Sequence, residues 1–133
     1  MISQSIKLKS EPQSINAVEG IIDELKDEFS FSDDCYGNIL VAVTEAVNNA
    51  IYHGNQSDPS KEVHLNYEFK QEKISFSVSD QGTGFDIYNL PDPTLPENLE
   101  KPNGRGIFLM KQLADQLIFS DSGRVVELYF NLA

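Results

Sequence analysis

Apolar and polar residues alternate over residues 1–9, a spacing that predicts a half-buried strand. Over residues 15–29 the apolar residues recur at helical spacing instead, with acidic residues mostly on the other side. Ser10 is expected to cap this helix, with Pro12 in its first turn, where the missing N–H does no harm. The beginning of the chain therefore predicts a strand followed by an amphipathic helix.

A second helix is predicted from about Cys35 to His53, after the capping sequence Ser32-Asp33-Asp34. Apolar residues cover most of its circumference, which implies burial on several sides. Gly54 and Asn55 are expected to form the turn that ends it.

Two strands are predicted over residues 63–69 and 74–78, joined by a tight connection at Gln71-Glu72. Each has one apolar and one polar face, as in an antiparallel pair that covers a core. Near the end of the chain, a helix is predicted to open at Gly104-Arg105-Gly106, followed by a strand pair around Gly123.

Between these parts, residues 86–103 carry four prolines and no sustained periodicity. A loop of that length inside a compact domain is usually functional or disordered. The chain contains no internal repeat and no linker that would separate a second domain. We therefore expect a single domain over residues 1–133.

Charge and cysteine content narrow the possible partners. Ten Lys and Arg residues stand against 21 Asp and Glu, a net charge of -11, which repels nucleic acid and anionic membranes. A local anion site for a nucleotide remains possible in an acidic protein. Cys35 is the only cysteine, which excludes an intrachain disulfide. No segment resembles a signal peptide or a membrane span, so we expect a cytoplasmic protein.

Glu45 and Asn49 lie four residues apart on the second predicted helix and therefore share one face. A buried amide without a partner costs about 2 kcal/mol, and a ligand can supply the partner. Mg²⁺ prefers oxygen ligands, so the Asn49 amide oxygen could complete a shell of phosphate oxygens and water. Glu45 could accept a proton from an attacking hydroxyl. Alternatively, both side chains bond to neighbouring backbone or form an exposed stripe.

Asp80 follows directly on a predicted strand, and its carboxylate can accept a hydrogen bond from an exocyclic amine. Gly82 and Gly84 lack the Cβ atoms that would hold a flat ring or a phosphate away from the backbone. The same D-x-G-x-G string is also typical of a plain tight turn.

At the start of the last predicted helix, Gly104 and Gly106 leave backbone N–H groups free where the helix dipole favours an anion. Arg105, and also Lys101, could add the cations that a triphosphate needs. A solvent-exposed arginine in a flexible loop is the alternative.

The order of these segments is more specific than any one of them. TEAVNNAIYHG at residues 44–54, DQGTGF at 80–85 and GRGIFLM at 104–110 closely resemble the N, G1 and G2 boxes of the GHKL ATPase superfamily. The short length and the first of these strings resemble its bacterial anti-sigma factor and serine-protein kinase branch. The resemblance covers nearly the whole chain.

This resemblance implies an α+β fold, a two-layer Bergerat-type sandwich with a mixed β-sheet and helices packed on one face. ATP would lie between the helices under a lid formed by residues 86–103. By position, Asn49 would bind Mg²⁺, Glu45 would be the general base and Asp80 would bond the adenine amine.

The glycines and cations follow by position as well. Gly82 and Gly84 would border the adenine, while the segment from Gly104 to Ile107, with Arg105, would line the phosphates. In this chain Lys101 or Arg105 would have to supply the charge that relatives often carry just before these glycines. Gly123 is followed by Arg124, whereas relatives often have a threonine there.

The branch implies a serine-protein kinase that doubles as an anti-sigma factor. The phosphate acceptor would be a serine of an anti-anti-sigma (STAS-type) protein, the other partner a sigma factor, and the protein a homodimer. An alternative is a binding module in which the nucleotide sets only the shape of a partner-binding surface. The catalytic domain of a sensor histidine kinase is a weaker interpretation, because no helix that could carry a phosphoacceptor histidine precedes the domain.

Overall fold

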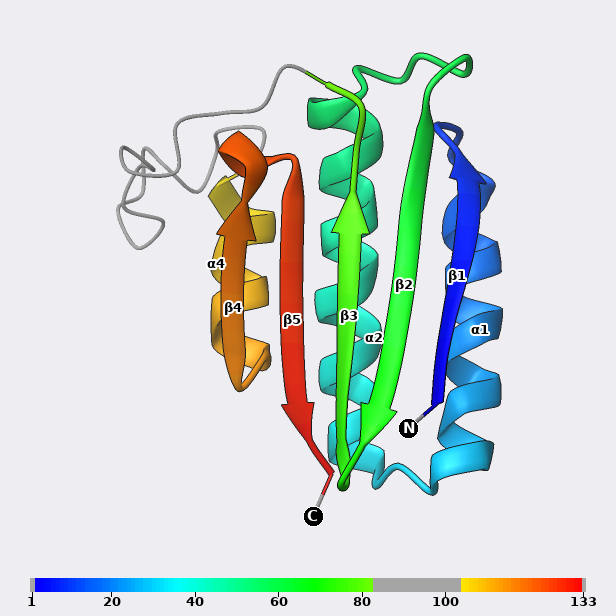
Figure 1. Ribbon diagram of the computed structural model, residues 1–133, viewed down its shortest axis with the longest axis vertical. Coiled ribbons are helices and arrows are strands. Elements are labelled where there is room, and N and C mark those ends of the chain that lie inside the picture. The colour runs from blue at the N-terminus through cyan, green and yellow to red at the C-terminus, as the bar shows by residue number, and fades with distance from the viewer. Residues whose placement is uncertain (1, 83–103, 133) are drawn as a thin grey trace.

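Figure 1 shows a computed structural model in which helices lie behind a single twisted sheet; residues 2–82 and 104–132 are described. The elements in chain order are β1 (Ile2–Lys9), α1 (Ser14–Phe29), α2 (Asp33–Asn49), the π-helix η1 (Ala50–Gly54), β2 (Glu62–Lys70), β3 (Lys73–Ser79), α4 (Gly104–Leu113), β4 (Gln116–Ser120), the 3₁₀ turn η2 (Asp121–Gly123) and β5 (Val125–Asn131). The predicted lid, residues 86–103, lies outside the described residues.

The sheet has the strand order β1-β2-β3-β5-β4, and each neighbouring pair of these described strands is antiparallel. The predicted α+β class and the placement of the helices on one face are confirmed (Figure 1). The sheet is not mixed, however. β3 and β4 run in the same direction, but β5 returns through η2 and lies between them, so it is antiparallel to both.

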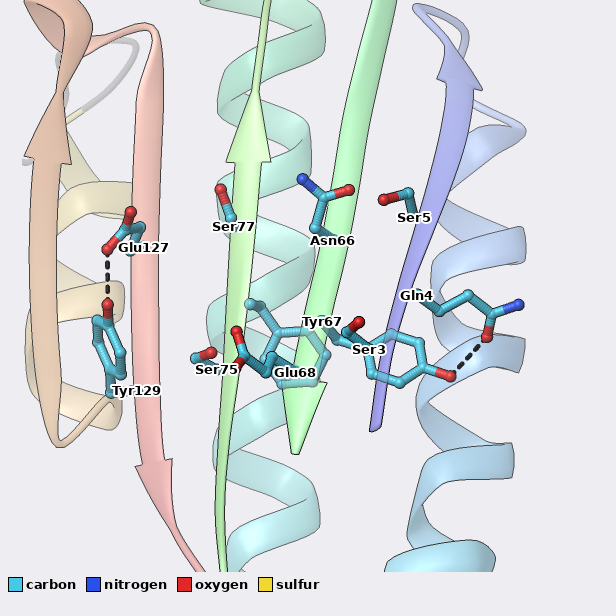
Figure 2. A pocket seen from close by; sticks show the side chains of 11 residues that line it. Ser3, Gln4, Ser5, Asn66, Tyr67, Glu68, Ser75, Ser77, Glu127 and Tyr129 are labelled. Atoms are coloured by element: carbon cyan, nitrogen blue, oxygen red, sulfur yellow. Dashed lines mark hydrogen bonds between the residues drawn. The ribbon is translucent and has the colours of Figure 1, made fainter. Parts of the chain in front are cut away.

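The strand register separates an apolar face from a polar one. One row of paired residues crosses all five strands on the helix side: Ile6, Leu65, Val78, Val126 and Phe119. In the adjacent row, Ser5, Asn66, Ser77 and Glu127 face away from the helices (Figure 2), and Ile118 pairs with Glu127 at the end of this row. The alternation seen in the sequence thus directs one face of each strand into the core.

Helix α2 lies behind the centre of the sheet, between α1 and α4 (Figure 1). Five of its apolar residues are buried, as predicted, whereas Val41 of the same apolar run is exposed. Ile107 and Met110 of α4 are buried as well. Burial of one such aliphatic side chain stabilises the fold by about 1.5–3 kcal/mol. The apolar contacts of α2 therefore hold it as the central element of the helical layer.

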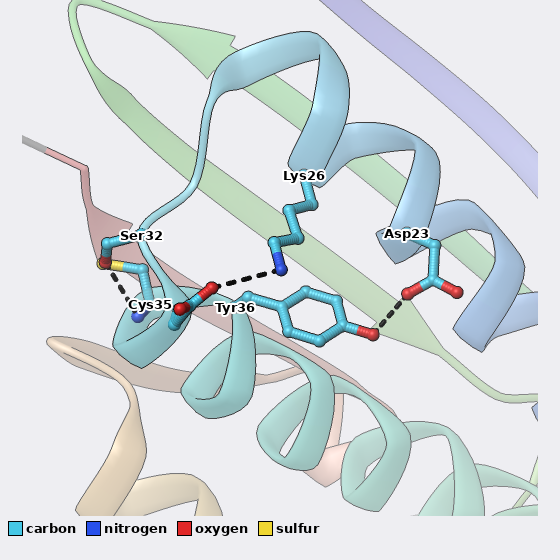
Figure 3. A network of polar contacts seen from close by, with 6 residues as sticks. Asp23, Lys26, Ser32, Cys35 and Tyr36 are labelled. Atoms are coloured by element: carbon cyan, nitrogen blue, oxygen red, sulfur yellow. Dashed lines mark hydrogen bonds and ion pairs between the residues drawn. The ribbon is translucent and has the colours of Figure 1, made fainter.

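Polar contacts fasten α1 to the start of α2 (Figure 3). The Ser32 hydroxyl caps α2 by accepting a hydrogen bond from the backbone N–H of its third residue at 3.1 Å, as predicted. The Lys26 ammonium lies 3.3 Å from a carboxylate oxygen of Asp33 and 4.5 Å from the centroid of the Tyr36 ring. The Tyr36 hydroxyl donates to Asp23. These contacts link the two helices at the protein surface.

The predicted role of Ser10 is wrong. Helix α1 begins at Ser14, because residues 11–13 form a separate turn closed by a bond from the Ser14 N–H to the Glu11 carbonyl oxygen. Ser10 is buried, and its hydroxyl donates to the Lys61 carbonyl oxygen at 2.9 Å. Among the described residues, no helix is both long and apolar enough to cross a membrane.

Candidate functional site

Asn49, the last residue of α2, carries a buried oxygen without a partner. Its side chain is half-buried, and within the described part of the chain its Oδ1 atom receives no hydrogen bond. An unsatisfied buried acceptor costs about 1–3 kcal/mol and in a native protein calls for an explanation. The atom is of the type that a divalent cation or a ligand donor would satisfy.

The helical backbone continues beyond Asn49. The backbone continues as the π-helix η1, whose wide turn is closed by a bond of 2.8 Å from the Asn55 N–H to the Ala50 carbonyl oxygen. π-helical turns are rare and frequently occur at functional sites. This turn carries the chain from Asn49 to Gly54, which lies against the segment that follows β3.

Asp80 directly follows β3, as predicted, and is held by backbone groups. Its own N–H donates to the Arg124 carbonyl oxygen at 2.9 Å, and the Gly82 N–H donates to its Oδ1 atom at 2.8 Å. A Cβ atom on Gly54 would lie 2.3 Å from the Asp80 Cγ atom. A Cβ atom on Gly82 would lie 1.9 Å from the Gly54 carbonyl oxygen. Both glycines are therefore required by protein packing around this carboxylate.

Asp80 is partly removed from water, and this burial disfavours its charged form. Burial raises the pKa of Asp80, while the Gly82 N–H and the nearby charge of Arg124 act in the opposite direction. The Arg124 guanidinium itself pairs with Asp121 at 3.2 Å. Partial removal of Asp80 from water strengthens any hydrogen bond that it makes to a ligand.

Glu45 lies one turn before Asn49 on α2 and faces the start of α4. A Cβ atom on Gly106 would come within 3.0 Å of the Glu45 Oε2 atom, so this glycine leaves room for the carboxylate. Gly106 of α4 lies against Glu45 near the end of α2, and Gly54 of η1 lies against Asp80 after β3. Three segments far apart in the sequence therefore meet at one end of α2, as their motifs predict.

The structure describes only some of the other predicted site residues. Gly84 and Lys101 lie outside the described residues, as does the side chain of Arg105. Gly104 begins α4, and Ile107 is buried in its first turn. The predicted contacts of these residues with a nucleotide stay predictions.

Two residues of this region were expected to form only a turn. Gly54 packs against Asp80, and Asn55 is fully buried with three side-chain hydrogen bonds. A Gly-Asn pair after a helix is typical of an exposed turn. The sequence carries no local signal that distinguishes such a pair from a buried one.

A hollow of about 340 Å³ lies on the sheet face that points away from the helices (Figure 2). Short polar side chains such as Ser75, Ser77 and Asn66 line it. The described residues around it include Glu68 and Glu127 but neither lysine nor arginine. Because nothing there offsets the charge of a triphosphate, the end of α2 is the better candidate for a nucleotide site.

Comparison with known proteins identifies the family of the chain. Residues 8–130 match the family described as "Histidine kinase-like ATPase domain". The chain belongs to this family. It is 25% identical over 118 residues to the serine-protein kinase RsbW of Oceanobacillus iheyensis, covering 84% of this chain and 75% of that protein. It is 36% identical over 92 residues to the anti-sigma F factor of Clostridium perfringens, covering 65% and 64% of the two chains.

The fold also has a counterpart among solved structures. The crystal structure of the RsbU and RsbW domains of Rv1364c from Mycobacterium tuberculosis matches 99% of this chain with a TM-score of 0.70 and 16% identity. This chain spans 33% of that longer one, and the likeness concerns the fold alone. The GHKL family and the anti-sigma and serine-protein kinase branch predicted from the sequence are confirmed, as is ATP-dependent kinase function at that level.

Proposed function

We propose that the chain is a serine-protein kinase that binds ATP with Mg²⁺ at the end of α2. It transfers the γ-phosphoryl group to a serine of an anti-anti-sigma (STAS-type) protein and restrains a sigma factor. The observation that carries this proposal is the buried Oδ1 atom of Asn49, which has no partner among the described residues and lies one turn beyond Glu45 on the same helix.

The donor set suits Mg²⁺ in particular. Mg²⁺ keeps several water and phosphate oxygens in its shell and needs few protein ligands. Asn49 offers one oxygen, and the described residues contain no group of three or more His, Cys, Asp or Glu that could hold a metal ion. Asn49 is therefore the residue that would hold the ion together with the nucleotide, and the ion would offset phosphate charge.

Asp80 and Glu45 have separate tasks in this proposal. The half-buried Asp80 carboxylate accepts a hydrogen bond from the adenine amine, and the close packing of Gly54 and Gly82 keeps it in place. Glu45, whose Oε2 atom faces Gly106 at the start of α4, accepts the proton of the attacking serine hydroxyl. Binding thus depends on Asp80 and Asn49, and transfer depends on Glu45.

The test uses radiolabelled ATP, Mg²⁺ and a purified anti-anti-sigma-type protein. Glu45→Ala should keep nucleotide affinity and lose transfer, whereas Asn49→Ala should lose nucleotide binding. Glu24 is an exposed carboxylate of α1, so Glu24→Ala is the matched control and should change neither nucleotide binding nor transfer. If the wild-type protein binds ATP but labels no partner, a nucleotide-gated binding module is the better description.

The state of assembly and the surroundings of the protein are part of the proposal. A homodimer is expected, and light scattering of the purified protein would measure its mass. The single domain over residues 1–133, the cytoplasmic location and the absence of nucleic acid or membrane partners stay predictions.

A further inference from the structure

Asn55 is a polar residue in the interior of the protein. Its side chain is 0% exposed, and all of its polar atoms have partners. The Oδ1 atom accepts a hydrogen bond of 2.7 Å from the Gln81 N–H. The Nδ2 atom donates to the Glu62 carbonyl oxygen at 3.0 Å and to the Ser10 hydroxyl at 2.8 Å.

Two of these bonds belong to a closed ring. The Gln81 side-chain oxygen accepts a hydrogen bond of 2.7 Å from the Glu62 N–H, while the Glu62 carbonyl oxygen accepts from Asn55. Asn55 in turn accepts from the Gln81 N–H. We name Asn55, Glu62 and Gln81 the amide ring. It joins the end of η1, the start of β2 and the segment after β3.

The amide ring fixes the residue between Asp80 and Gly82. Gln81 is held by both its backbone N–H and its side chain, so the peptide groups on either side of it are held as well. Asn55 also directly follows Gly54, which packs against the Asp80 carboxylate. Asn55 thus holds in place both segments that enclose the Asp80 carboxylate, the end of η1 and the residues after β3.

We propose that Asn55 is a positioning residue of the nucleotide site, acting through Gln81 without touching the ligand. This inference rests on the proposed function, in which the nucleotide bonds to Asp80. An amide is required because it combines an acceptor for the Gln81 N–H with a donor for the Glu62 carbonyl oxygen. An aspartate would place a carboxylate against that carbonyl oxygen, and an alanine would leave both backbone groups unpaired. A fully satisfied buried network of this kind makes the segment rigid.

Ser10 provides a matched control for a merely structural role. Its hydroxyl accepts from Asn55 and donates to the Lys61 carbonyl oxygen, but it lies outside the amide ring. Ser10→Ala removes buried hydrogen bonds from the same cluster and leaves the bond between Asn55 and Gln81 intact. A general loss of stability would therefore appear in both Ser10→Ala and Asn55→Ala.

The experiment compares wild type, Asn55→Ala, Gln81→Ala and Ser10→Ala at a temperature well below each melting point. Calorimetry gives the Kd for ATP with Mg²⁺, and amide hydrogen exchange without nucleotide gives the protection of residues 81 and 82. Because Asn55→Ala loses a buried hydrogen bond, we expect its Kd to be about tenfold higher and its exchange at residues 81 and 82 to be about tenfold faster. Gln81→Ala, at an exposed position, should show the same changes to a smaller degree. Ser10→Ala should lower the melting temperature with its Kd and exchange unchanged.

Two results would overturn the inference. One is an Asn55→Ala protein with a lower melting temperature but wild-type Kd and wild-type exchange at residues 81 and 82. The other applies if Asn55→Ala does not fold: Gln81→Ala with a wild-type Kd and wild-type exchange at residues 81 and 82 would then contradict the inference. Failure of the wild-type protein to bind ATP would instead contradict the proposed function. Faster exchange in Asn55→Ala would still support the fixing of this segment.

Discussion

Gly54 and Asp80 are packed so closely that a Cβ atom on Gly54 would lie 2.3 Å from the Asp80 Cγ atom and 2.4 Å from its Oδ2 atom. Contacts this short cannot persist, so a side chain on Gly54 must displace the carboxylate. We expect Gly54→Ala to weaken ATP binding by at least about tenfold, the equivalent of ~1.4 kcal/mol. Calorimetric titration with ATP and Mg²⁺ measures the change.

Gly37→Ala is the control for that substitution, since Gly37 lies on α2 and a Cβ there would meet no atom within 4 Å. An alanine in place of a helical glycine is expected to stabilise the protein by about 1 kcal/mol. ATP affinity should remain that of the wild type. Wild-type affinity in Gly54→Ala would show that Asp80 does not contact the nucleotide.

Asn49→Ala should separate ligand binding from stability. The substitution removes a buried acceptor that has no partner in the described part of the chain, and such an acceptor costs about 1–3 kcal/mol. The melting temperature without ligand is therefore expected to stay the same or rise, while the stabilisation by ATP with Mg²⁺ disappears. Thermal unfolding with and without ligand tests both parts.

Asn38→Ala, an exposed asparagine of the same helix, serves as the comparison for Asn49→Ala and should retain the stabilisation by ATP. Chelation of the metal in the wild-type protein should reproduce the loss seen in Asn49→Ala. A large drop in the melting temperature of Asn49→Ala without ligand would argue that Asn49 is needed for the fold itself.

Gly106→Ala is expected to act on phosphate transfer through Glu45. The new methyl group would lie 3.0 Å from the Glu45 Oε2 atom, so the carboxylate must move by a few tenths of an ångström. Such a shift should slow transfer by about tenfold, because the efficiency of a general base depends on its position. Single-turnover transfer to the protein partner gives the rate.

A double variant shows whether the effect passes through Glu45. Transfer should already be lost in Glu45→Gln, and adding Gly106→Ala should then change nothing further. Nucleotide affinity should remain similar in the three proteins. An equal loss of affinity in Gly106→Ala would place the effect on binding of the phosphates instead.

The pH dependence of stability should carry the signature of Asp80. Burial raises its pKa above the ordinary value of 3.8, so the native state binds this proton more tightly than the unfolded state. As the pH rises from 3.8 through the folded pKa, this carboxylate therefore lowers the stability. Asp80→Asn should be more stable than wild type above that window and equal to it below. Urea unfolding at a series of pH values measures the difference.

Asp58→Asn should change the stability in the opposite direction to Asp80→Asn. Hydrogen bonds from the Ser60 hydroxyl at 2.7 Å and the Ser60 N–H at 2.9 Å lower the pKa of Asp58 below 3.8. Its contribution is present above pH 3.8 and is lost as the pH falls through the folded pKa. The same sign in both variants would show that burial does not determine the titration of Asp80.

Much of the local structure follows from the order of residues alone. Alternation predicts β2 and β3 with the correct inward residues, and Gln71 and Glu72 form the tight connection between them with φ of 53° and 60°. The apolar circumference of α2 predicts its central position. Asn49, Asp80 and Gly106 are recognisable because each motif combines a polar residue or a glycine with the end of a regular element.

Other features depend on partners that no local pattern specifies. Periodicity shows which face of a strand is apolar, but it does not show that β5 lies between β3 and β4. The mixed sheet implied by the family resemblance is wrong for the described strands, because β5 in that place is antiparallel to both neighbours. Ser10 suits a helix cap by composition, yet its partner is the carbonyl oxygen of Lys61, 51 residues away.

The sequence by itself determined most of the elements, the family and three segments of the candidate site. Only the tertiary structure decided that Gly54 encloses Asp80 and that Asn55 is buried. The partners of Asn55 lie 45 and 26 residues away, in Ser10 and Gln81. A buried polar group is stable only where such distant donors and acceptors meet it, and that meeting is a property of the packed fold.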